Sequence, residues 1–456
     1  MKKLSLLSLA ALMSATAFAE GYQVNLLSAK QSGMGHTGAG LKLGAESMHF
    51  NPAGMAFMEG NADMSVGVSG VFATATCTHD GVKYTTDNSP STPIYAYAGF
   101  RIYDNLKAGI AVTTPFGNGI NWTKNWAGST LVQDISLKVF SVQPTISWRI
   151  IDNLSIGAGL MVSFGNVDLS KGLLAPGALS ALAPYLSGYT SAMNDVTPVS
   201  VNIKGKSETR LGFNVGAMWD INEHWTLGVA YRSKMMMKVK NGDATLDYTI
   251  DKDIIKQAIG ILQAQAAAQG GNLSHLSNLE NIHGGTFSAE MPCPSNLGIG
   301  VGYKPNKRLT VALDVQLVGW SAYDKLEINF HEEGLQYFNQ SLTKNYHNAM
   351  AVRIGTEYAV TKRFDARLGF YYDGSPVDEN YYNPETPGMT KLCPTAGFSF
   401  RPYKGLSIDA SCMYVQGVSR DGAYTTKSIV TGAESTFEGR YTTTAWSPSI
   451  GISYKF

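Results

Sequence analysis

Four arginines are the side chains in this sequence best suited to hold an anion. Each lies in a segment where polar and apolar residues alternate, and each belongs to the polar row: Arg210, Arg232, Arg353 and Arg367. A guanidinium group presents several N–H donors in a planar fork that matches the two oxygens of a carboxylate. The pattern therefore predicts four candidate carboxylate-binding residues on the polar faces of their strands.

Acidic residues in similar positions support a second interpretation of these arginines. The acids on or near the same polar rows are Glu208, Asp314, Glu357 and Asp365. An internal network of ion pairs would occupy the guanidinium groups without any ligand. The sequence leaves both interpretations open.

No pattern typical of an enzyme accompanies these residues. The fragment His347-Asn348 is the nearest approach to a serine-hydrolase site, but no nucleophile signature goes with it. No P-loop or zinc-ligand spacing occurs, and the glycine run 298–302 lies inside a strand pattern rather than a dinucleotide fingerprint. His36 and His49 are interpreted as hydrogen-bonding residues. We therefore expect a protein that is not an enzyme and has no cofactor and no metal.

The four cysteines do not form a motif. Cys77, Cys293, Cys393 and Cys412 are far apart in the sequence, and none belongs to a C-x-x-C pair. An exported chain could form disulfides, and a Cys293–Cys393 bridge is one possibility. Because Cys293 and Cys412 share their rows with apolar residues, we favour free thiols that face lipid.

The C-terminal segment indicates which kind of structure holds these residues. Read backwards, every second residue is apolar or aromatic: Phe456, Tyr454, Ile452, Ile450, Pro448 and Trp446. The residues between them are small or polar, so the segment is a strand with one apolar face and one polar face. In an exported bacterial chain this pattern is typical of the last strand of a membrane-spanning β-barrel.

The first nineteen residues are typical of a secretory signal peptide. Lys2 and Lys3 precede a mostly apolar run over 4–13, and Ala17-Phe18-Ala19 is an A-x-A cleavage site. An uncleaved anchor helix is the alternative, but the run is too short for a bilayer of roughly 30 Å. We predict removal of 1–19. The mature chain would then have 34 basic and 35 acidic side chains, a net charge of 34 − 35 = −1, and we expect no binding to nucleic acid.

Residues 20–61 differ from the rest of the chain. They are rich in Gly, Ala and Ser, and the tract 33–40 is too flexible for a long helix. Asn51, Pro52 and Ala53 form a turn in which proline presets φ. We interpret 20–61 as a compact plug rather than as a pair of strands.

Residues 62–456 read as an all-β domain, a transmembrane antiparallel barrel. Fourteen strands are predicted: 62–77, 92–103, 105–117, 130–149, 154–170, 199–219, 225–246, 286–304, 308–330, 344–360, 363–375, 389–402, 405–425 and 436–456. An even number suits a closed bacterial barrel. Short turns alternate with longer connections, which we place on the periplasmic and extracellular sides respectively.

Two long connections, 171–198 and 250–285, carry apolar residues that need an explanation. The second begins with a helix signal behind Asp251 and Asp253. The two loops either pack on each other as a lid or form a groove that captures an apolar ligand. The candidate groove residues are Leu174, Leu179, Leu182, Leu186, Ile255, Ile259 and Leu262.

Fragments along the whole chain resemble the FadL/TodX family of outer-membrane transporters for long-chain fatty acids and other hydrophobic compounds. The similar fragments, in order, are Gly21-Tyr-Gln-Val-Asn25, Ser32-Gly33, Gly38-Ala-Gly40, Asn51-Pro52-Ala53, Leu211-Gly212, Tyr231-Arg232-Ser233, Gly302-Tyr303, Arg367-Leu-Gly-Phe-Tyr-Tyr-Asp373 and Gly397-Phe398. Each fragment alone is weak, and their order over a chain of fitting length is the specific feature.

The resemblance implies a 14-stranded barrel plugged by 20–61. It also implies ligand capture between the two long loops, a hatch around Asn51, Pro52 and Ala53, and an inward kink of the third strand that opens the wall sideways. Pro115, Gly117 and Gly119 would form that kink, because proline removes a ladder donor and glycine allows unusual φ. A plain strand-ending turn at 115–119 is the alternative.

The expected partners follow from the resemblance. They are long-chain fatty acids or other hydrophobic small molecules, and the lipid and lipopolysaccharide of the outer membrane of a Gram-negative bacterium, with the protein acting as a monomer. A general diffusion porin and an adhesion or receptor barrel remain the alternatives to a transporter.

Overall fold

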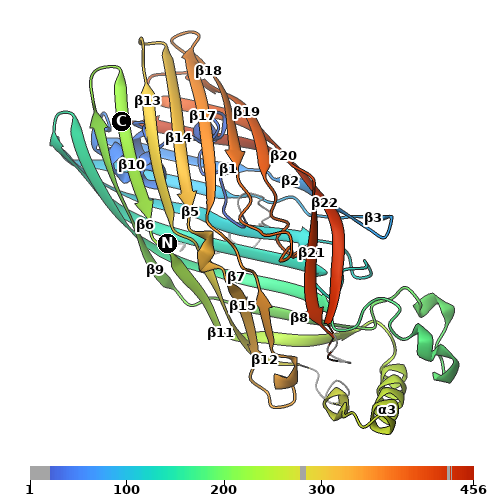
Figure 1. The fold of residues 1–456 in the computed structure, drawn as a ribbon. Helices are drawn as coiled ribbons and strands as arrows, with labels where there is room; N and C mark the ends of the chain where they lie inside the picture. The colour runs from blue at the N-terminus through green and yellow to red at the C-terminus, as the bar shows by residue number, and fades with distance from the viewer. Residues whose placement is uncertain (1–20, 278–283, 429–431, 433) are drawn as a thin grey trace, which may run out of the picture.

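The barrel wall is one closed antiparallel ring of strands (Figure 1). The computed structural model describes residues 21–277, 284–428, 432 and 434–456, so the predicted signal peptide lies outside the described residues. The ring closes because β1 (Ala62–Ser69) pairs with β22 (Glu434–Lys455) on one side and with β4 (Ile94–Tyr103) on the other.

The wall has fourteen strands around the ring, as predicted, and several of them are broken into two segments. In order they are β1 with β2 (Phe72–His79), β4, β5 (Leu106–Asn121), β6 (Asp134–Ile151), β7 (Leu154–Gly172), β8 (Val199–Lys206) with β9 (Arg210–Asp220), β10 (Trp225–Arg232) with β11 (Met235–Tyr248), β12 (Gly284–Cys293) with β13 (Asn296–Tyr303), β14 (Leu309–Val318) with β15 (Lys325–Phe330), β16 (Gln340–Thr343) with β17 (Ala349–Ala359), β18 (Phe364–Asp373), β19 (Lys391–Phe400), β20 (Leu406–Gly417) with β21 (Arg420–Lys427), and β22. β3 (Val82–Thr85), which was not predicted, forms a hairpin with β2.

One half of the wall carries an apolar row on its outer face. In β22, Trp446 and Ile450 are 58% and 53% exposed, whereas Ser447 and Ser449 between and beside them are 1% and 5% exposed. An exposed apolar row over several strands of a barrel is the band that contacts lipid. The alternation read from the C-terminal segment therefore has the predicted orientation.

In the other half, near α3 in Figure 1, the alternation is inverted. Leu326, Ile328 and Phe330 of β15 are buried, and the polar residues between them are exposed. β8, β11 and β12 follow the same rule, with apolar residues inside and polar residues outside. This half has a water-facing outer surface and an apolar interior, which is the arrangement of a barrel that extends beyond the bilayer.

The inversion corrects the prediction for one cysteine. Cys293 was predicted to face lipid, but it follows Met291 on the inward row of β12 and is fully buried. Cys412 lies on the outward row of β20, as predicted. All four cysteines are free thiols, so the Cys293–Cys393 bridge is not formed.

The N-terminal segment lies within the ring and packs against its inner face. Its helical turns are short: α1 (Ala29–Ser32), η1 (Gly44–Glu46), α2 (Ser47–Phe50) and η2 (Pro52–Phe57). Two glycines show how close the packing is, because a Cβ added at Gly228 or Gly369 would lie 1.8 Å from the Ala39 oxygen or 2.1 Å from the Gly35 nitrogen. The wall is built of glycine there so that the backbone of the segment can approach.

The two long connections contain most of the helical segments outside the N-terminal segment. The loop after β7 holds η3 (Ser180–Tyr185) and η4 (Ser191–Met193), and the loop after β11 holds α3 (Lys252–Ala268) and η5 (Ser274–Ser277). Asp251 caps α3 by accepting a hydrogen bond from the Asp253 nitrogen, which confirms the predicted helix start. η6 (Trp320–Ala322) and η7 (Gln336–Phe338) flank β15.

Among the described residues, no helix is both long and apolar enough to cross a bilayer.

Candidate functional site

An apolar space lies inside the inverted half of the barrel. This apolar cavity holds about 740 Å³ of empty space, its open mouth included. Its wall is built from inward residues of six strands and from two aromatic side chains: Ile135, Leu137, Val139, Val167, Leu169, Ile203, Met237, Val239, Phe287, Ala289, Met291, Leu326 and Ile328, with Tyr22 and Tyr323. A concave, mostly apolar surface of this size is typical of a small-molecule binding site.

The apolar surface continues from this cavity toward the long loops. Leu173, Val201, Ala244 and Phe330 line a further space of about 340 Å³. They lie on β8, β11 and β15, or just beyond the end of β7, a few positions along from residues of the apolar cavity. An apolar path therefore runs along one side of the barrel interior.

At the outer end of this path, the predicted groove residues lie in one hydrophobic cluster. Leu179, Leu182, Leu186, Ile255 and Ile259 are buried in it. Leu174 and Leu262 are partly buried against the same cluster, and the Ser187 nitrogen donates to Gln257 Oε1 at 2.9 Å between the two loops. All seven residues thus belong to one hydrophobic cluster, which also extends through the barrel interior, and a hydrogen bond links the two loops. Whether they act as a lid or as a groove stays a prediction.

The third strand of the wall, β5, bends into the interior where the kink was predicted. Its pairing with β6 shifts register between Thr113 and Phe116, and its pairing with β4 ends at Thr113. Pro115, Gly117 and Gly119 belong to a run of six consecutive buried residues, 115–120, in a barrel whose strands otherwise alternate. The strand-ending turn is wrong, because β5 continues to Asn121.

The N-terminal segment pairs with the edge of β5 that this bend exposes. The Gly117 nitrogen donates to the Tyr22 oxygen at 2.8 Å, and the Val24 nitrogen donates to the Pro115 oxygen at 3.0 Å. Residues 22–24 therefore occupy the place that a neighbouring wall strand would take.

At Tyr22 the N-terminal segment passes from the apolar cavity to a second space. The Tyr22 ring contacts Phe116, Trp320 and Tyr323, with ring centroids 6.3, 4.8 and 5.8 Å away, and its hydroxyl donates to the Pro292 oxygen. Tyr22 lines the apolar cavity, and the next residue, Gln23, lines the second space.

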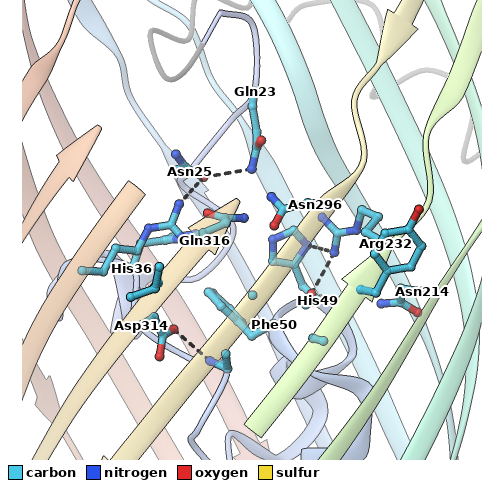
Figure 2. A pocket seen from close by; sticks show the side chains of 16 residues that line it. Gln23, Asn25, His36, His49, Phe50, Asn214, Arg232, Asn296, Asp314 and Gln316 are labelled. Carbon is cyan, nitrogen blue, oxygen red and sulfur yellow. Dashed lines mark hydrogen bonds between the residues drawn. The ribbon is translucent and has the colours of Figure 1, made fainter. Parts of the chain in front are cut away.

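The second space is a polar chamber of about 530 Å³ between the N-terminal segment and the wall (Figure 2). Arg232 and Arg353 reach it from β10 and β17, and Asp314 reaches it from β14. Arg232 donates to His49 Nδ1 and to the His49 oxygen at 2.9 and 2.8 Å. Arg353 donates to Asn25 Oδ1 at 3.3 Å.

The two chamber histidines are held neutral. Burial lowers the pKa of His36 and of His49 well below the usual 6.5, and the positive charges of Arg353 and Arg232 lower both further. The hydrogen bond from Arg232 to His49 Nδ1 is compatible with a neutral ring, which can accept at one nitrogen.

We predict that acid will destabilise the protein through these histidines. Their pKa is depressed in the folded state, so their contribution to the free energy of unfolding is complete above the unfolded pKa of about 6.5. This contribution is lost as pH falls below that value, at up to about 1.4 kcal/mol per pH unit for each histidine. His36→Asn should therefore lose less thermal stability between pH 7.5 and pH 5 than the wild type.

His224→Asn, at an exposed turn between β9 and β10, is the matched control. If the wild type, His36→Asn and His224→Asn all lost the same thermal stability between pH 7.5 and pH 5, the acid effect could not be assigned to His36.

The other two predicted arginines are paired with carboxylates. Arg210 donates to Glu208 Oε2 at 2.9 Å, and Arg367 donates from Nε to Glu357 Oε2 at 2.7 Å. The network interpretation therefore describes Arg210 and Arg367, but within the part of the chain that the structure describes, Arg232 and Arg353 have no carboxylate within 4.0 Å. The four candidates thus fall into two classes.

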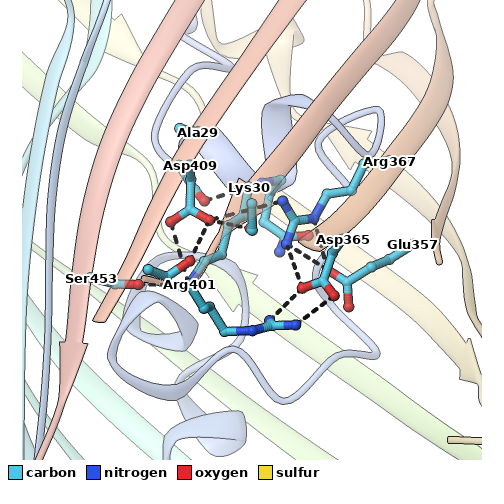
Figure 3. A network of polar contacts seen from close by, with 12 residues as sticks. Ala29, Lys30, Glu357, Asp365, Arg367, Arg401, Asp409 and Ser453 are labelled. Atoms are coloured by element: carbon cyan, nitrogen blue, oxygen red, sulfur yellow. Dashed lines mark hydrogen bonds and ion pairs between the residues drawn. The ribbon is translucent and has the colours of Figure 1, made fainter. Parts of the chain in front are cut away.

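Arg367 lies at the centre of an ion network that also holds the N-terminal segment (Figure 3). It lies 3.9 Å from both Asp365 and Asp409, and Asp365 is paired with Arg401. Lys30 of the N-terminal segment reaches Asp409 at 3.7 Å and Ser453 Oγ at 2.8 Å. The network fixes α1 to the wall.

We predict that Arg367→Met will be strongly destabilising. Arg367, Asp365 and Asp409 are 5% exposed or less. Removing the cation takes the ion-pair partner from Glu357 and leaves Arg401 alone to compensate Asp365 and Lys30 alone to compensate Asp409. Breaking a buried pair in this way costs about 3–5 kcal/mol. The temperature at which the barrel loses its compact gel mobility should fall markedly. Arg440→Met, which removes an exposed arginine beside exposed Asp421, is the control and should change this temperature little. Equal temperatures for the two variants would contradict the prediction.

The Asn51-Pro52-Ala53 turn docks the N-terminal segment onto β7 and β9. The Asn51 Nδ2 donates to the oxygens of Ala39 and Ala217 at 2.8 and 3.0 Å, and its Oδ1 accepts from the Ala53 nitrogen. Ala53 in turn accepts from Ser155 Oγ at 2.9 Å. The motif couples two parts of the segment to the wall, and its role as a hatch stays a prediction.

Two important residues were not predicted. Tyr22 carries only a weak signal, an aromatic residue at the start of the mature chain. Glu385 lies in an irregular loop and shows no periodicity. It lines the apolar cavity, forms a buried ion pair with Lys344, and its backbone oxygen accepts from Asn118 Nδ2 at 2.7 Å.

Comparison with known proteins places these features in context. The family model described as outer membrane protein transport protein (OMPP1/FadL/TodX) matches residues 10–456. A long-chain fatty acid transport protein of Escherichia coli O6:H1 is 21% identical over 420 residues, which cover 89% of each chain.

Two solved structures share the fold. A FadL homologue of Pseudomonas aeruginosa superposes with a TM-score of 0.78 at 21% identity, covering 96% of this chain and 100% of that one. The toluene transporter TodX of Pseudomonas putida superposes with a TM-score of 0.68 at 16% identity, covering 96% and 99%.

Proposed function

Because this chain belongs to the FadL/TodX family of outer-membrane transport proteins, we propose that it is a passive channel that takes up hydrophobic compounds through the apolar cavity. The observation that carries the proposal is that cavity, an apolar space of about 740 Å³ inside a barrel whose other wall half contacts lipid. The family consists of transporters of the outer membrane, and the finer steps below are proposals for this chain.

The cavity offers a place where an apolar compound leaves water without entering the lipid of the outer leaflet. Each methylene group that the cavity buries contributes about 0.8 kcal/mol. The further apolar space around Leu173 and Phe330 extends the same surface toward the loops. A ligand captured outside would therefore move inward over apolar surface throughout.

We place capture at the two long loops. Their apolar residues form one cluster, and the contact between Ser187 and Gln257 is a single exposed hydrogen bond. A lipid-like molecule that inserts between the loops would replace one apolar contact by another. The two loops would then separate with little cost in free energy, and the space between them would form the groove that holds the ligand.

We place the exit at the bend of β5. Residues 115–120 are all buried and lie beyond the end of the pairing between β5 and β4, and residues 22–24 pair with the edge so exposed. Movement of residues 22–24 would break two backbone hydrogen bonds and the contacts of the Tyr22 ring. The bound compound could then leave sideways into the membrane without crossing the polar chamber.

The residues that line the cavity are suited to bind the apolar part of a substrate rather than a charged group. Among the described lining residues, Glu290 and Glu385 are ionisable acids and none is a lysine or an arginine. The relatives are named for long-chain fatty acids and for toluene. We expect the cavity to bind uncharged hydrocarbon, whether a whole molecule or the tail of a fatty acid.

Uptake and conductance together test this function. Cells that lack their own transporter and express this chain should accumulate labelled toluene or dodecanoate faster than cells with an empty vector. The purified barrel in a planar bilayer should pass little steady current. A large steady current without hydrophobe uptake would instead indicate a general diffusion porin.

A further inference from the structure

The polar chamber contains two guanidinium groups, one buried and one half-buried, that have no carboxylate within ion-pair distance among the described residues. Arg353 is 5% exposed; it donates to Asn25 and its guanidinium carbon lies 5.6 Å from the centre of the Tyr371 ring. Arg232 donates only to His49 among the described residues. A buried guanidinium without an acid is costly, and natural proteins rarely keep one without an anionic partner.

The carboxylate that lines the same chamber, Asp314, faces Arg353 across the β14–β17 ladder, and one of its two oxygens is engaged by backbone N–H groups. Asp314, labelled in Figure 2, accepts hydrogen bonds at Oδ2 from the nitrogens of Gly38 and Ala39, at 2.6 and 2.9 Å; the figure draws the second of them. Asp314 is thus a fixing point for the backbone of the N-terminal segment. With two arginines, one aspartate and two neutral histidines, the lining of the chamber has one excess positive charge.

Several buried donors around the chamber have no partner among the residues that the structure describes. They are Nε of Arg232, Nε of Arg353, Nδ2 of Asn25 and Nδ2 of Asn296. Three buried oxygens of lining residues also lack a donor among the described residues: Oδ1 of Asn214, Oδ1 of Asp314 and Oε1 of Gln316. Asn25 and Asn296 are 2% and 8% exposed. These four N–H groups come from the N-terminal segment and from three wall strands, and all belong to residues that line one space. Buried donors in native proteins are normally satisfied.

We infer that the polar chamber is an anion-binding site in which Arg232 and Arg353 hold a carboxylate or a similar small oxyanion. The N–H donors of guanidinium groups match the oxygens of such a group. Asn25 and Asn296 supply further donors. Because Asn25 belongs to the N-terminal segment and the arginines to the wall, a bound anion would join the two.

The anion has two possible sources with the same chemistry. It is either the carboxylate of a ligand whose tail lies in the apolar cavity beyond Tyr22, or a small free anion that enters from the periplasmic side. In the first case the site would supply the charge recognition that the cavity lining lacks. This inference needs the chamber alone, and it stands even if the proposed uptake fails.

Three soluble probes test the site on the full mature protein in a non-ionic detergent. They are hexanoate, its uncharged counterpart hexan-1-ol, and inorganic phosphate, titrated calorimetrically in a zwitterionic buffer of low, fixed ionic strength. Hexanoate should bind the wild type, and Arg353→Gln and Arg232→Gln should each weaken this binding at least tenfold. Arg353→Lys, which keeps the charge but not the fork, should recover part of it.

The matched control is Arg440→Gln, which removes the same charge from the exposed outer surface and should bind hexanoate like the wild type. Arginine-dependent binding of phosphate as well as hexanoate would identify a site for free anions. Arginine-dependent binding of hexanoate alone would identify a head-group site. Hexanoate and phosphate binding that is absent, or equal in wild type and both glutamine variants, would overturn the inference.

Hexan-1-ol separates this result from the proposed function. Its binding should be the same in the wild type and in the arginine variants, because its hydrocarbon chain needs only the apolar cavity. If hexan-1-ol does not bind the wild type, this result counts against the apolar cavity as a binding site. The conclusion about the anion-binding site is unaffected by it. Variants that do not fold would be recognised by their gel mobility, and the Arg353→Lys comparison would then decide.

Discussion

Replacing Ala289 with tryptophan will reduce binding and uptake of hydrophobic compounds at least tenfold. Ala289 lies on the inward row of β12 and lines the apolar cavity. An indole at this position occupies the space that the ligand needs, and each tenfold loss of affinity corresponds to about 1.4 kcal/mol. The readouts are the affinity for a labelled hydrocarbon in detergent and the accumulation of the same compound in cells.

The control for this substitution puts the same side chain on the other face of the barrel. Leu313 belongs to the lipid-facing row and is 47% exposed, so Leu313→Trp should leave binding and uptake near the wild-type level. Both variants should keep the gel mobility of a folded barrel. Normal uptake by folded Ala289→Trp would show that the substrate takes another path.

The failure to predict Ala289 and its neighbours from the sequence has a physical cause. An alternating strand shows that it has two faces, but it does not show which face is inside. In β22 the apolar row faces lipid, whereas in β12 and β15 the apolar row faces the interior. The error over Cys293 has the same origin, since the pattern was assigned to lipid along the whole strand.

Features that depend on local chemistry were predictable, and features that depend on long-range contacts were not. The strand count and the capped helix behind Asp251 follow from periodicity and capping, whereas the irregularity near Pro115 was expected from the family resemblance. That Arg367 is paired while Arg353 is not depends on which strands become neighbours around the ring. Nothing in a single alternating segment carries that information.

The role of Tyr22 is the clearest example of a long-range contact. Its partners Phe116, Pro292 and Trp320 come from three distant segments, and they meet only once the ring has closed around the N-terminal segment. The sequence shows a tyrosine near the predicted cleavage site. The structure shows an aromatic group that lines the apolar cavity, directly before a residue that lines the polar chamber.

Deleting residues 21–27 from the mature chain will raise ion conductance at least tenfold and lower hydrophobe uptake. The deletion removes Tyr22 and the two backbone hydrogen bonds to β5, but it leaves Ser28, which caps α1 and bonds Glu46. The wall strands pair with each other independently of this segment, so the barrel should fold. The apolar cavity and the polar chamber would then be continuous, and water and ions would pass through both.

A pair of point variants separates the ring of Tyr22 from the backbone pairing. Tyr22→Ala keeps the hydrogen bonds of residues 22–24 and should raise conductance less than the deletion does. Tyr185→Ala, at a tyrosine that is 71% exposed in a loop, is the control and should change neither conductance nor uptake. If the deletion variant folds and conducts no more than the wild type, residues 21–27 are not the barrier. Closure must then lie deeper, in the part of the segment that Asn51 and the Lys30–Asp409 contact fix to the wall.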